Sequence, residues 1–221
     1  MPGISARGTT LLISDMTPLA ADYNAVGQVV SITGPSLALD TVDVTAHNST
    51  DGWEEHVATI LRTGELTLEV NYDPASPMHM ATPGAGLPIT GVDVAPANEF
   101  VVAGDWTALF VAGVHFRIAG STNNDGSWET VSSTYAAGPN ETTIVVAQDV
   151  GADADGDIFV TTLPMAMTER LLVDLILLFP DIGATEWDMA AFVTAIEPSA
   201  PFDGKLSASV SLKVSGAPTL V

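Results

Sequence analysis

The chain has 221 residues, with 27 acidic against 6 basic side chains, a formal net charge of −21 at pH 7 and no cysteine. Because 47% of the residues are hydrophobic and only 15% are charged, the chain has enough apolar material for a folded core, which excludes a disordered protein. The missing cysteine excludes a disulfide scaffold, a thiolate nucleophile and a Cys-ligated zinc site. The acidic excess disfavours sequence-specific nucleic-acid binding, since phosphate contacts depend on Lys and Arg.

Neither a signal peptide nor a membrane span is expected. The N-terminus has no cationic start followed by an apolar stretch of the required length. The longest apolar block, residues 171–179, contains Asp174 and is much shorter than the roughly 20 residues that a spanning helix needs.

Alternation of apolar and polar residues is the main pattern along the chain. Residues 65–72 place leucine, valine and tyrosine on one face and polar side chains on the other, which is the two-residue repeat of a half-buried strand. The polar set is Glu65, Thr67, Glu69 and Asn71. Residues 206–214 repeat the pattern with a serine-rich outer face. Shorter strands are predicted at 26–32, 41–46, 128–134, 142–147 and 187–194.

Evidence for helices is limited to two segments. Residues 53–61 are predicted to form two helical turns, with Glu54 and Glu55 near the positive end of the helix. Residues 165–178 are open to two interpretations, a helix that begins near Thr168 or a fully buried strand.

Two turn-rich seams, residues 83–88 and 151–157, bound a middle segment. This segment, 85–160, has ten acids and one cation, and residues 123–126 (Asn-Asn-Asp-Gly) are typical of a hairpin turn. We therefore expect an inserted β-module at 85–160. Residues 1–84 and 161–221 would then form one discontinuous domain.

No catalytic motif is present, and the four histidines, His47, His56, His79 and His115, lack metal-ligand spacing and are expected at the surface or in turns. Asp153, Asp155 and Asp157 alternate as calcium ligands can, but Ile158 and Pro164 stand where an EF-hand needs glycine and glutamate. A solvated acidic turn is the better interpretation. We expect no metal, no cofactor and no enzymatic activity; an enzyme, for instance a cell-wall hydrolase, would need convergent acids in a sugar-sized cleft.

One ordered set of motifs stands out. It comprises a Gly-Pro turn, an Asp-x-x-Asp-Val-Thr strand, a Gly-Glu strand that ends in Asn-Tyr-Asp-Pro, a Phe-Pro-Asp segment and a Gly-x-Pro ending. This order resembles the tail tube proteins (major tail proteins) of long-tailed bacteriophages, in two blocks that leave out the middle segment. The matching positions include Gly34, Pro35, Asp40, Asp43, Asn71, Asp73, Pro74, Pro180 and Gly216.

The resemblance implies a mainly β fold, a tail-tube-type β-sandwich or barrel with a short helix, plus the inserted small β-domain. It also implies hexameric rings that stack into a tail tube, the conduit for DNA ejection. The implied partners are further copies of the chain and the tape measure, tail terminator and baseplate proteins, in a virion tail assembled in the host cytoplasm. Genomic DNA would pass without sequence-specific binding.

The inserted segment is a departure from the family, which runs from the first block to the second through a short helix. Residues 85–160 resemble small β-modules of other phage structural proteins. The alternative function is therefore a β-rich tail-associated binding protein whose module recognises a host surface or another tail protein.

The polar face of residues 65–72 is the candidate lumen face, because like charge would keep DNA from being gripped in transit. The acids could equally decorate the outside and serve solubility. Two poorly periodic segments, an N-terminal arm at about 1–25 and residues 78–87, are expected to become ordered only on assembly.

Overall fold

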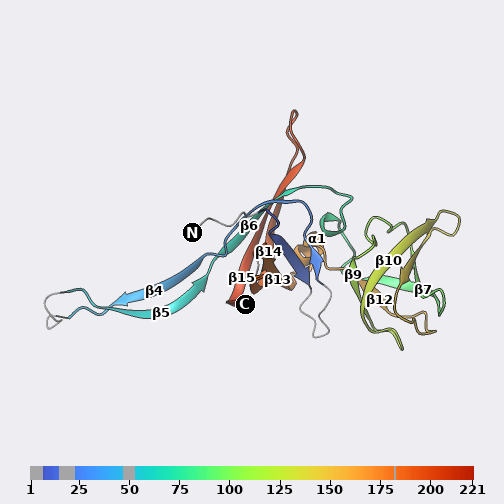
Figure 1. Ribbon diagram of the computed structural model, residues 1–221, viewed down its shortest axis with the longest axis horizontal. Coiled ribbons are helices and arrows are strands. Elements are labelled where there is room, and N and C mark those ends of the chain that lie inside the picture. The colour runs from blue at the N-terminus through green and yellow to red at the C-terminus, as the bar shows by residue number, and fades with distance from the viewer. Residues whose placement is uncertain (1–6, 15–22, 47–52, 182) are drawn as a thin grey trace.

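The computed structural model describes residues 7–14, 23–46, 53–181 and 183–221. Its strands form a seven-stranded sheet, a closed six-stranded barrel and a separate two-stranded hairpin (Figure 1). The predicted mainly β class with one short α-helix is confirmed.

The sheet has the strand order β2-β1-β13-β14-β15-β6-β3, and every neighbouring pair is antiparallel. Its strands come from both ends of the chain. They are β1 (Thr10–Ser14), β2 (Asn24–Ala25), β3 (Val29–Thr33), β6 (Glu65–Asn71), β13 (Leu172–Leu178), β14 (Glu186–Ser199) and β15 (Ser207–Leu220).

Alternation positions the core of this sheet. In β6, Leu66, Leu68 and Val70 are buried while Glu65 and Glu69 are exposed, as the sequence predicts. The first half of β15, residues 207–213, pairs with the whole of β6, and β15 buries its own alternate residues on the same side. A one-residue slip would turn both apolar rows to solvent, so burial fixes the register.

The predicted helix at 53–61 is wrong, because this segment enters β5 (His56–Thr63). β5 pairs with β4 (Leu37–Asp43) as an antiparallel hairpin. β-branched residues at four of its eight positions (Val57, Thr59, Ile60 and Thr63) favour a strand, and the pairing with β4 supplies the backbone partners that a helix would supply internally.

Residues 165–178 contain the end of a helix followed by a strand. The helix ends at Thr168 instead of beginning there, and the strand β13 alternates buried with half-buried residues instead of being fully buried. α1 (Leu163–Thr168) starts at Thr162, whose hydroxyl accepts a hydrogen bond from the Met165 N–H at 3.3 Å. It ends at Glu169, and the chain then enters β13 between β1 and β14. A 3₁₀ turn, η2 (Pro77–His79), packs near α1.

The barrel consists of strands that all lie within the middle segment. They are β7 (Leu87–Asp93), β8 (Glu99–Ala103), β9 (His115–Ala119), β10 (Gly126–Ala136), β11 (Glu141–Val146) and β12 (Asp157–Phe159). Phe100 contacts Phe116 and Trp128 edge to face, with ring centroids 6.3 and 4.9 Å apart. Leu87 pairs with Ile158, so the chain enters and leaves the barrel at neighbouring strands. That the barrel is an independent inserted domain stays a prediction.

Parts of both expected arms lie within the fold. Residues 10–14 form β1, where Leu11 and Ile13 are fully buried, because β13 offers them a paired edge. Met78 and His79 are also buried. Residues 1–6 and 15–22 of the expected N-terminal arm lie outside the described residues. None of the helices within the described ranges is both long and apolar enough to cross a bilayer.

Candidate assembly interface

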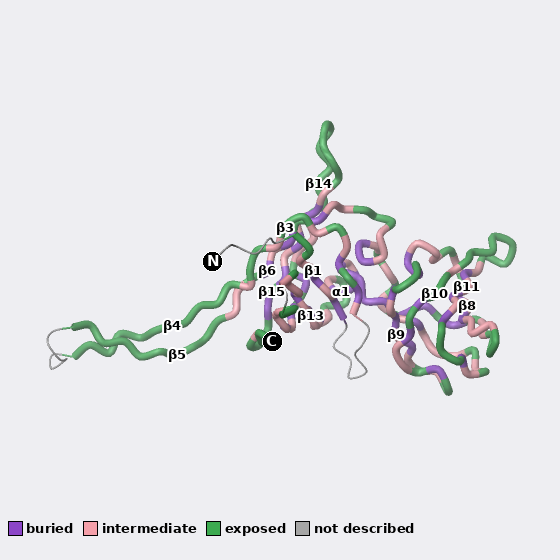
Figure 2. Tube along the Cα trace, in the orientation of Figure 1, coloured by how far each residue is buried: buried purple, intermediate pink, exposed green. Residues whose placement is uncertain are grey.

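The β4–β5 hairpin projects from the sheet as an isolated ribbon with almost every residue exposed (Figure 2). Leu39 lies directly across from Leu61, and Val42 across from Val57. The exposed fractions of Leu39 and Leu61 are 52% and 78%. A two-stranded ribbon with no packed face is marginally stable in water, and contiguous exposed apolar surface marks an interaction site.

The sheet itself also has an open margin. Among the described residues, β3 pairs with β6 on one side and with no strand on the other. Val30 in this strand is 51% exposed. Unpaired N–H and C=O groups along such an edge are a template for association with another chain.

The predicted polar face of β6 points away from the core. Glu65 and Glu69 are exposed, and Thr67 and Asn71 are half-buried. The register sets these four beside the polar residues of β15, namely Ser207, Ser209, Ser211 and Lys213. The result is a continuous polar strip over two central strands, and its role as a lumen wall stays a prediction.

Several family-motif positions have clear structural roles. Gly34 has φ +107°, and a Cβ there would lie 2.4 Å from the carbonyl oxygen of Glu65, so this turn next to Pro35 requires glycine. Asp40 pairs with Arg62 on the hairpin, Oδ2 to Nε, at 2.5 Å.

Another motif position, Asp43, closes a short turn on the hairpin. Its carboxylate accepts a hydrogen bond from the Thr45 N–H at 2.8 Å. Hydrogen bonds from the side chain and backbone of Thr45 lower the pKa of this carboxyl.

The remaining motif positions organise the turns next to the sheet. The Asn71 N–H donates to the carbonyl of Gln28 at 3.0 Å. Asp73 accepts from the Ala75 N–H at 3.0 Å, across Pro74. Pro180 lies against Gly8, and Gly216 has φ +81° in β15. These contacts show structural roles, and none places a ligand.

The weak calcium candidates hold loops together. The carboxylate of Asp155 accepts from the Ser121 hydroxyl at 2.8 Å and the Thr122 N–H at 3.0 Å, and the Thr122 bonds are the main cause of its lowered pKa. Asn123 donates to Asp153, and Asp157 lies in β12. Within the described part of the chain, no three histidine or acidic residues are placed to share a metal ion.

The sequence predicts His79 at the surface or in a turn but does not predict its burial, and it does not single out Asp188. His79 is buried in η2, stacks on Tyr72 at 5.5 Å between ring centroids and accepts the Asp73 N–H at Nδ1; burial lowers its pKa. Asp188 has a raised pKa, because it is partly desolvated and lies near Asp174. Both environments come from chain packing, which no local pattern encodes.

No protein-family model matches the chain, and no curated protein sequence matches it. Solved structures match the chain at low sequence identity. A chain of the tail of an empty gene transfer agent particle, determined with C6 symmetry, is 10% identical with TM-score 0.43, over 96% of this chain and 95% of that one. A chain of the native gene transfer agent virion is 11% identical with TM-score 0.42, over 96% and 95%. A chain of the anti-feeding prophage baseplate is 10% identical with TM-score 0.40, over 100% and 96%.

Proposed function

We propose that this protein is a structural tail subunit that assembles into stacked hexameric rings, forming a tail tube through which DNA is ejected. The observation that carries the proposal is the β4–β5 hairpin, a ribbon whose apolar side chains have nothing to pack against in a single copy. Such a surface is stabilised when a second copy covers it.

The open β3 edge supports the same conclusion. Hairpin and edge are different surfaces of the chain, so a contact between them is heterologous and repeats from copy to copy. Heterologous contacts close into rings or continue as filaments, and a stack of rings uses both outcomes.

The charge of the chain suits a conduit for DNA. At a net charge of −21, with six basic residues in all, the protein repels a polyanion more strongly than it binds one. The polar strip of β6 and β15, with Glu65 and Glu69 exposed, would form the wall of the bore. DNA could then slide along it without being held by phosphate contacts.

The proposed location is the virion tail, after assembly in the host cytoplasm. The proposed partners beyond other copies are the tape measure, terminator and baseplate proteins that a tube meets along its bore and at its ends. The role is structural, with no catalytic step.

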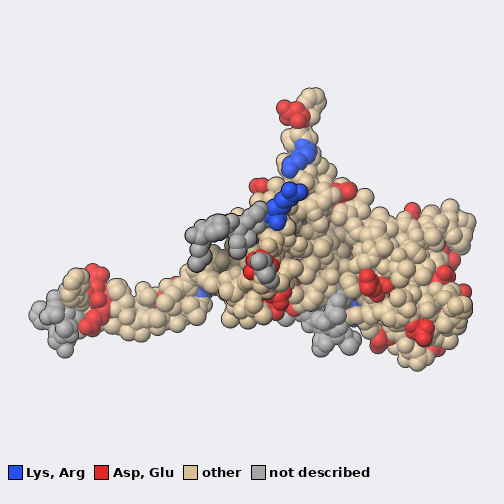
Figure 3. Space-filling view, viewed as in Figure 1, with Lys and Arg blue, Asp and Glu red and all other residues tan. Residues whose placement is uncertain are grey.

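A second candidate function concerns the barrel, which extends from the sheet on the side opposite the hairpin (Figure 1). This placement leaves it clear of the hairpin's surface. The barrel would then recognise a host surface or another tail protein. Its segment holds ten acids and one cation, and acids are scattered over the visible face, so a cationic partner is favoured (Figure 3).

Electron microscopy of purified protein tests the main proposal. We expect monomers or hexamers at low salt and low concentration, and rings or tubes of uniform bore when the protein is concentrated. Added salt should favour assembly, because it screens repulsion between acidic copies. A variant with residues 38–62 replaced by a short Gly-Ser turn lacks the hairpin and should stay monomeric under the same conditions. Wild-type protein that remains monomeric at every salt and concentration, even with tail partners added, would contradict the proposal.

A further inference from the structure

The β14–β15 hairpin ends in a tip that presents one aromatic side chain. β14 and β15 stay paired as far as Ser199 and Ser207, and the tip projects from the sheet (Figure 1). At the turn, the Gly204 N–H donates to the carbonyl of Pro201 at 3.4 Å, with Phe202 and Asp203 between them. The exposed fraction of Phe202 is 106%, so the ring touches almost nothing in its own chain.

The turn constrains the backbone that carries this ring. A Cβ on Gly204 would lie 2.6 Å from Cγ of Pro201, so the chain needs glycine here for the two residues to come together. An ordered turn with an outward aromatic residue loses little conformational entropy on binding.

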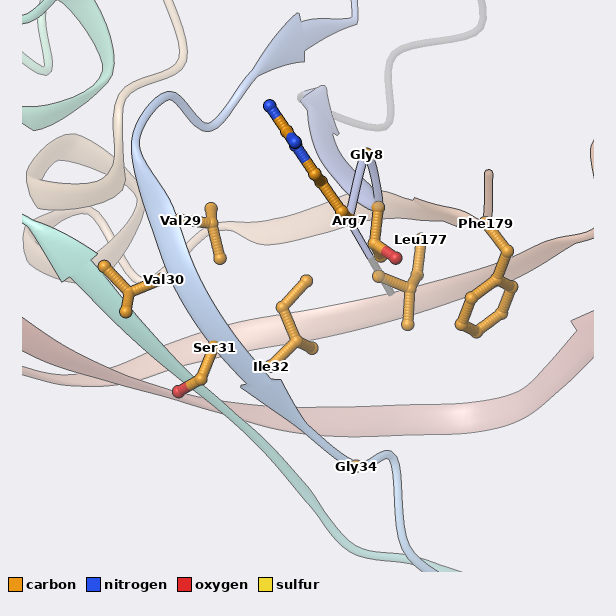
Figure 4. Close-up of a pocket in the computed structure, with 10 residues that line it drawn as sticks. Arg7, Gly8, Val29, Val30, Ser31, Ile32, Gly34, Leu177 and Phe179 are labelled. Atoms are coloured by element: carbon orange, nitrogen blue, oxygen red, sulfur yellow. The ribbon is translucent and has the colours of Figure 1, made fainter. Parts of the chain in front are cut away.

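A groove with both apolar and polar lining residues, the polar ones including Thr9 and Ser31, lies elsewhere on the sheet, between β3 and the end of β13. It has a volume of about 420 Å³. Figure 4 shows apolar side chains from both strands facing this space, with Arg7 at its side. The apolar lining residues include Val29, Ile32, Leu177 and Phe179.

Size and charge both favour the tip as the occupant. A cavity of this volume is at the small end of ligand sites, about 300–1,000 Å³, so it admits one or two side chains and not a folded element. An aromatic anchor in an apolar pocket is the usual centre of an interface. Asp203 follows Phe202 and has the charge opposite to that of Arg7 in the groove, and the tip also carries Lys205 two residues after Asp203.

We propose that Phe202 of one copy inserts into the groove between β3 and β13 of another copy, with Asp203 beside Arg7 of that copy. This inference rests on the proposed self-assembly and specifies a contact for it. Tip and groove are different surfaces, so the contact is heterologous and propagates through a ring or a stack.

Substitution at the tip gives the first test. Phe202→Ala should leave the free energy of unfolding of the monomer unchanged, because the ring is fully exposed. It should raise the concentration needed for assembly by about tenfold or more, as expected for loss of one buried aromatic anchor. Phe202→Leu, which keeps an apolar side chain, should assemble at a concentration close to that of the wild-type protein. An unchanged threshold in Phe202→Ala, with normal tubes, would overturn the docking and leave the tube proposal standing.

Cross-linking gives a second test that does not need complete tubes. The chain has no cysteine, so Asp203→Cys and Thr9→Cys, introduced into separate preparations and mixed, can join only to each other or to themselves. With a short bis-maleimide, we expect a mixed dimer of one Asp203→Cys and one Thr9→Cys chain. Thr9 lines the groove, whereas Val131, exposed on the barrel, is the control partner and should give none. Equal yields from the two partners at assembly concentrations would refute the contact.

Discussion

Removing the apolar contact of the β4–β5 hairpin should weaken assembly without unfolding the subunit. The change is the pair Leu39→Ser and Leu61→Ser. Fully burying a leucine contributes about 1.5–3 kcal/mol. These two side chains have 52% and 78% of their surface left to bury, so together they can contribute about 2–4 kcal/mol to one contact.

Since each 1.4 kcal/mol is a factor of ten, the threshold concentration for assembly should rise about 30- to 700-fold. Light scattering against concentration measures the threshold, and urea unfolding measures the monomer. The free energy of unfolding should fall by less than about 1 kcal/mol, the value of one cross-strand pair. Val94→Ser with Val131→Ser, both exposed on the barrel, is the matched control. An unchanged threshold, or a monomer that unfolds, would refute the reasoning.

Three further predictions concern the fold. Gly34→Ala should lower the free energy of unfolding of the subunit by about 1–3 kcal/mol, measured in urea, because the added Cβ would collide with the carbonyl of Glu65. Gly27→Ala, where the added Cβ meets open space, is the control and should be neutral. Equal stabilities of the two variants would contradict this prediction. Replacing residues 85–160 by a short linker should leave a subunit that still folds and assembles, since β7 and β12 are neighbours; collapse of the remaining sheet, seen by circular dichroism, would refute the discontinuous domain. His79 has a lowered pKa in the folded chain, so its contribution to stability is complete above the unfolded pKa of about 6.5 and is lost as pH falls through the range below it. His79→Asn should therefore reduce the fall in the free energy of unfolding between pH 7.5 and 5.5. An unchanged fall in the variant would show that other groups cause it.

Alternation predicted some of the strands that bury one face, such as β6 and β15, but it did not predict β8 or β9, whose residues also alternate. β6 follows its predicted range closely because Leu66, Leu68 and Val70 all enter the core. In β5 the same reasoning failed, since both faces of the hairpin are exposed and the apolar residues do not alternate. Val57, Ile60 and Leu61 instead have the spacing of a helical face. A strand with no packed face has no burial pattern in its own sequence.

Long-range pairing accounts for the rest. Residues 10–14 read as an irregular arm, yet they form β1 because β13, more than 150 residues later in the chain, lies beside them. The groove that receives the proposed anchor likewise needs β3 and β13 together. Motif order predicted the mainly β fold, but the projecting tip and the groove depend on three-dimensional arrangement.

A cryo-electron microscopy reconstruction of the assembled protein tests the central claim most directly. We expect a hollow tube with six copies per ring, neighbouring copies joined through the β4–β5 hairpin, and Glu65 and Glu69 facing the bore. A filament without a channel, or a tube whose bore is lined by Lys and Arg while β6 faces outward, would contradict this account.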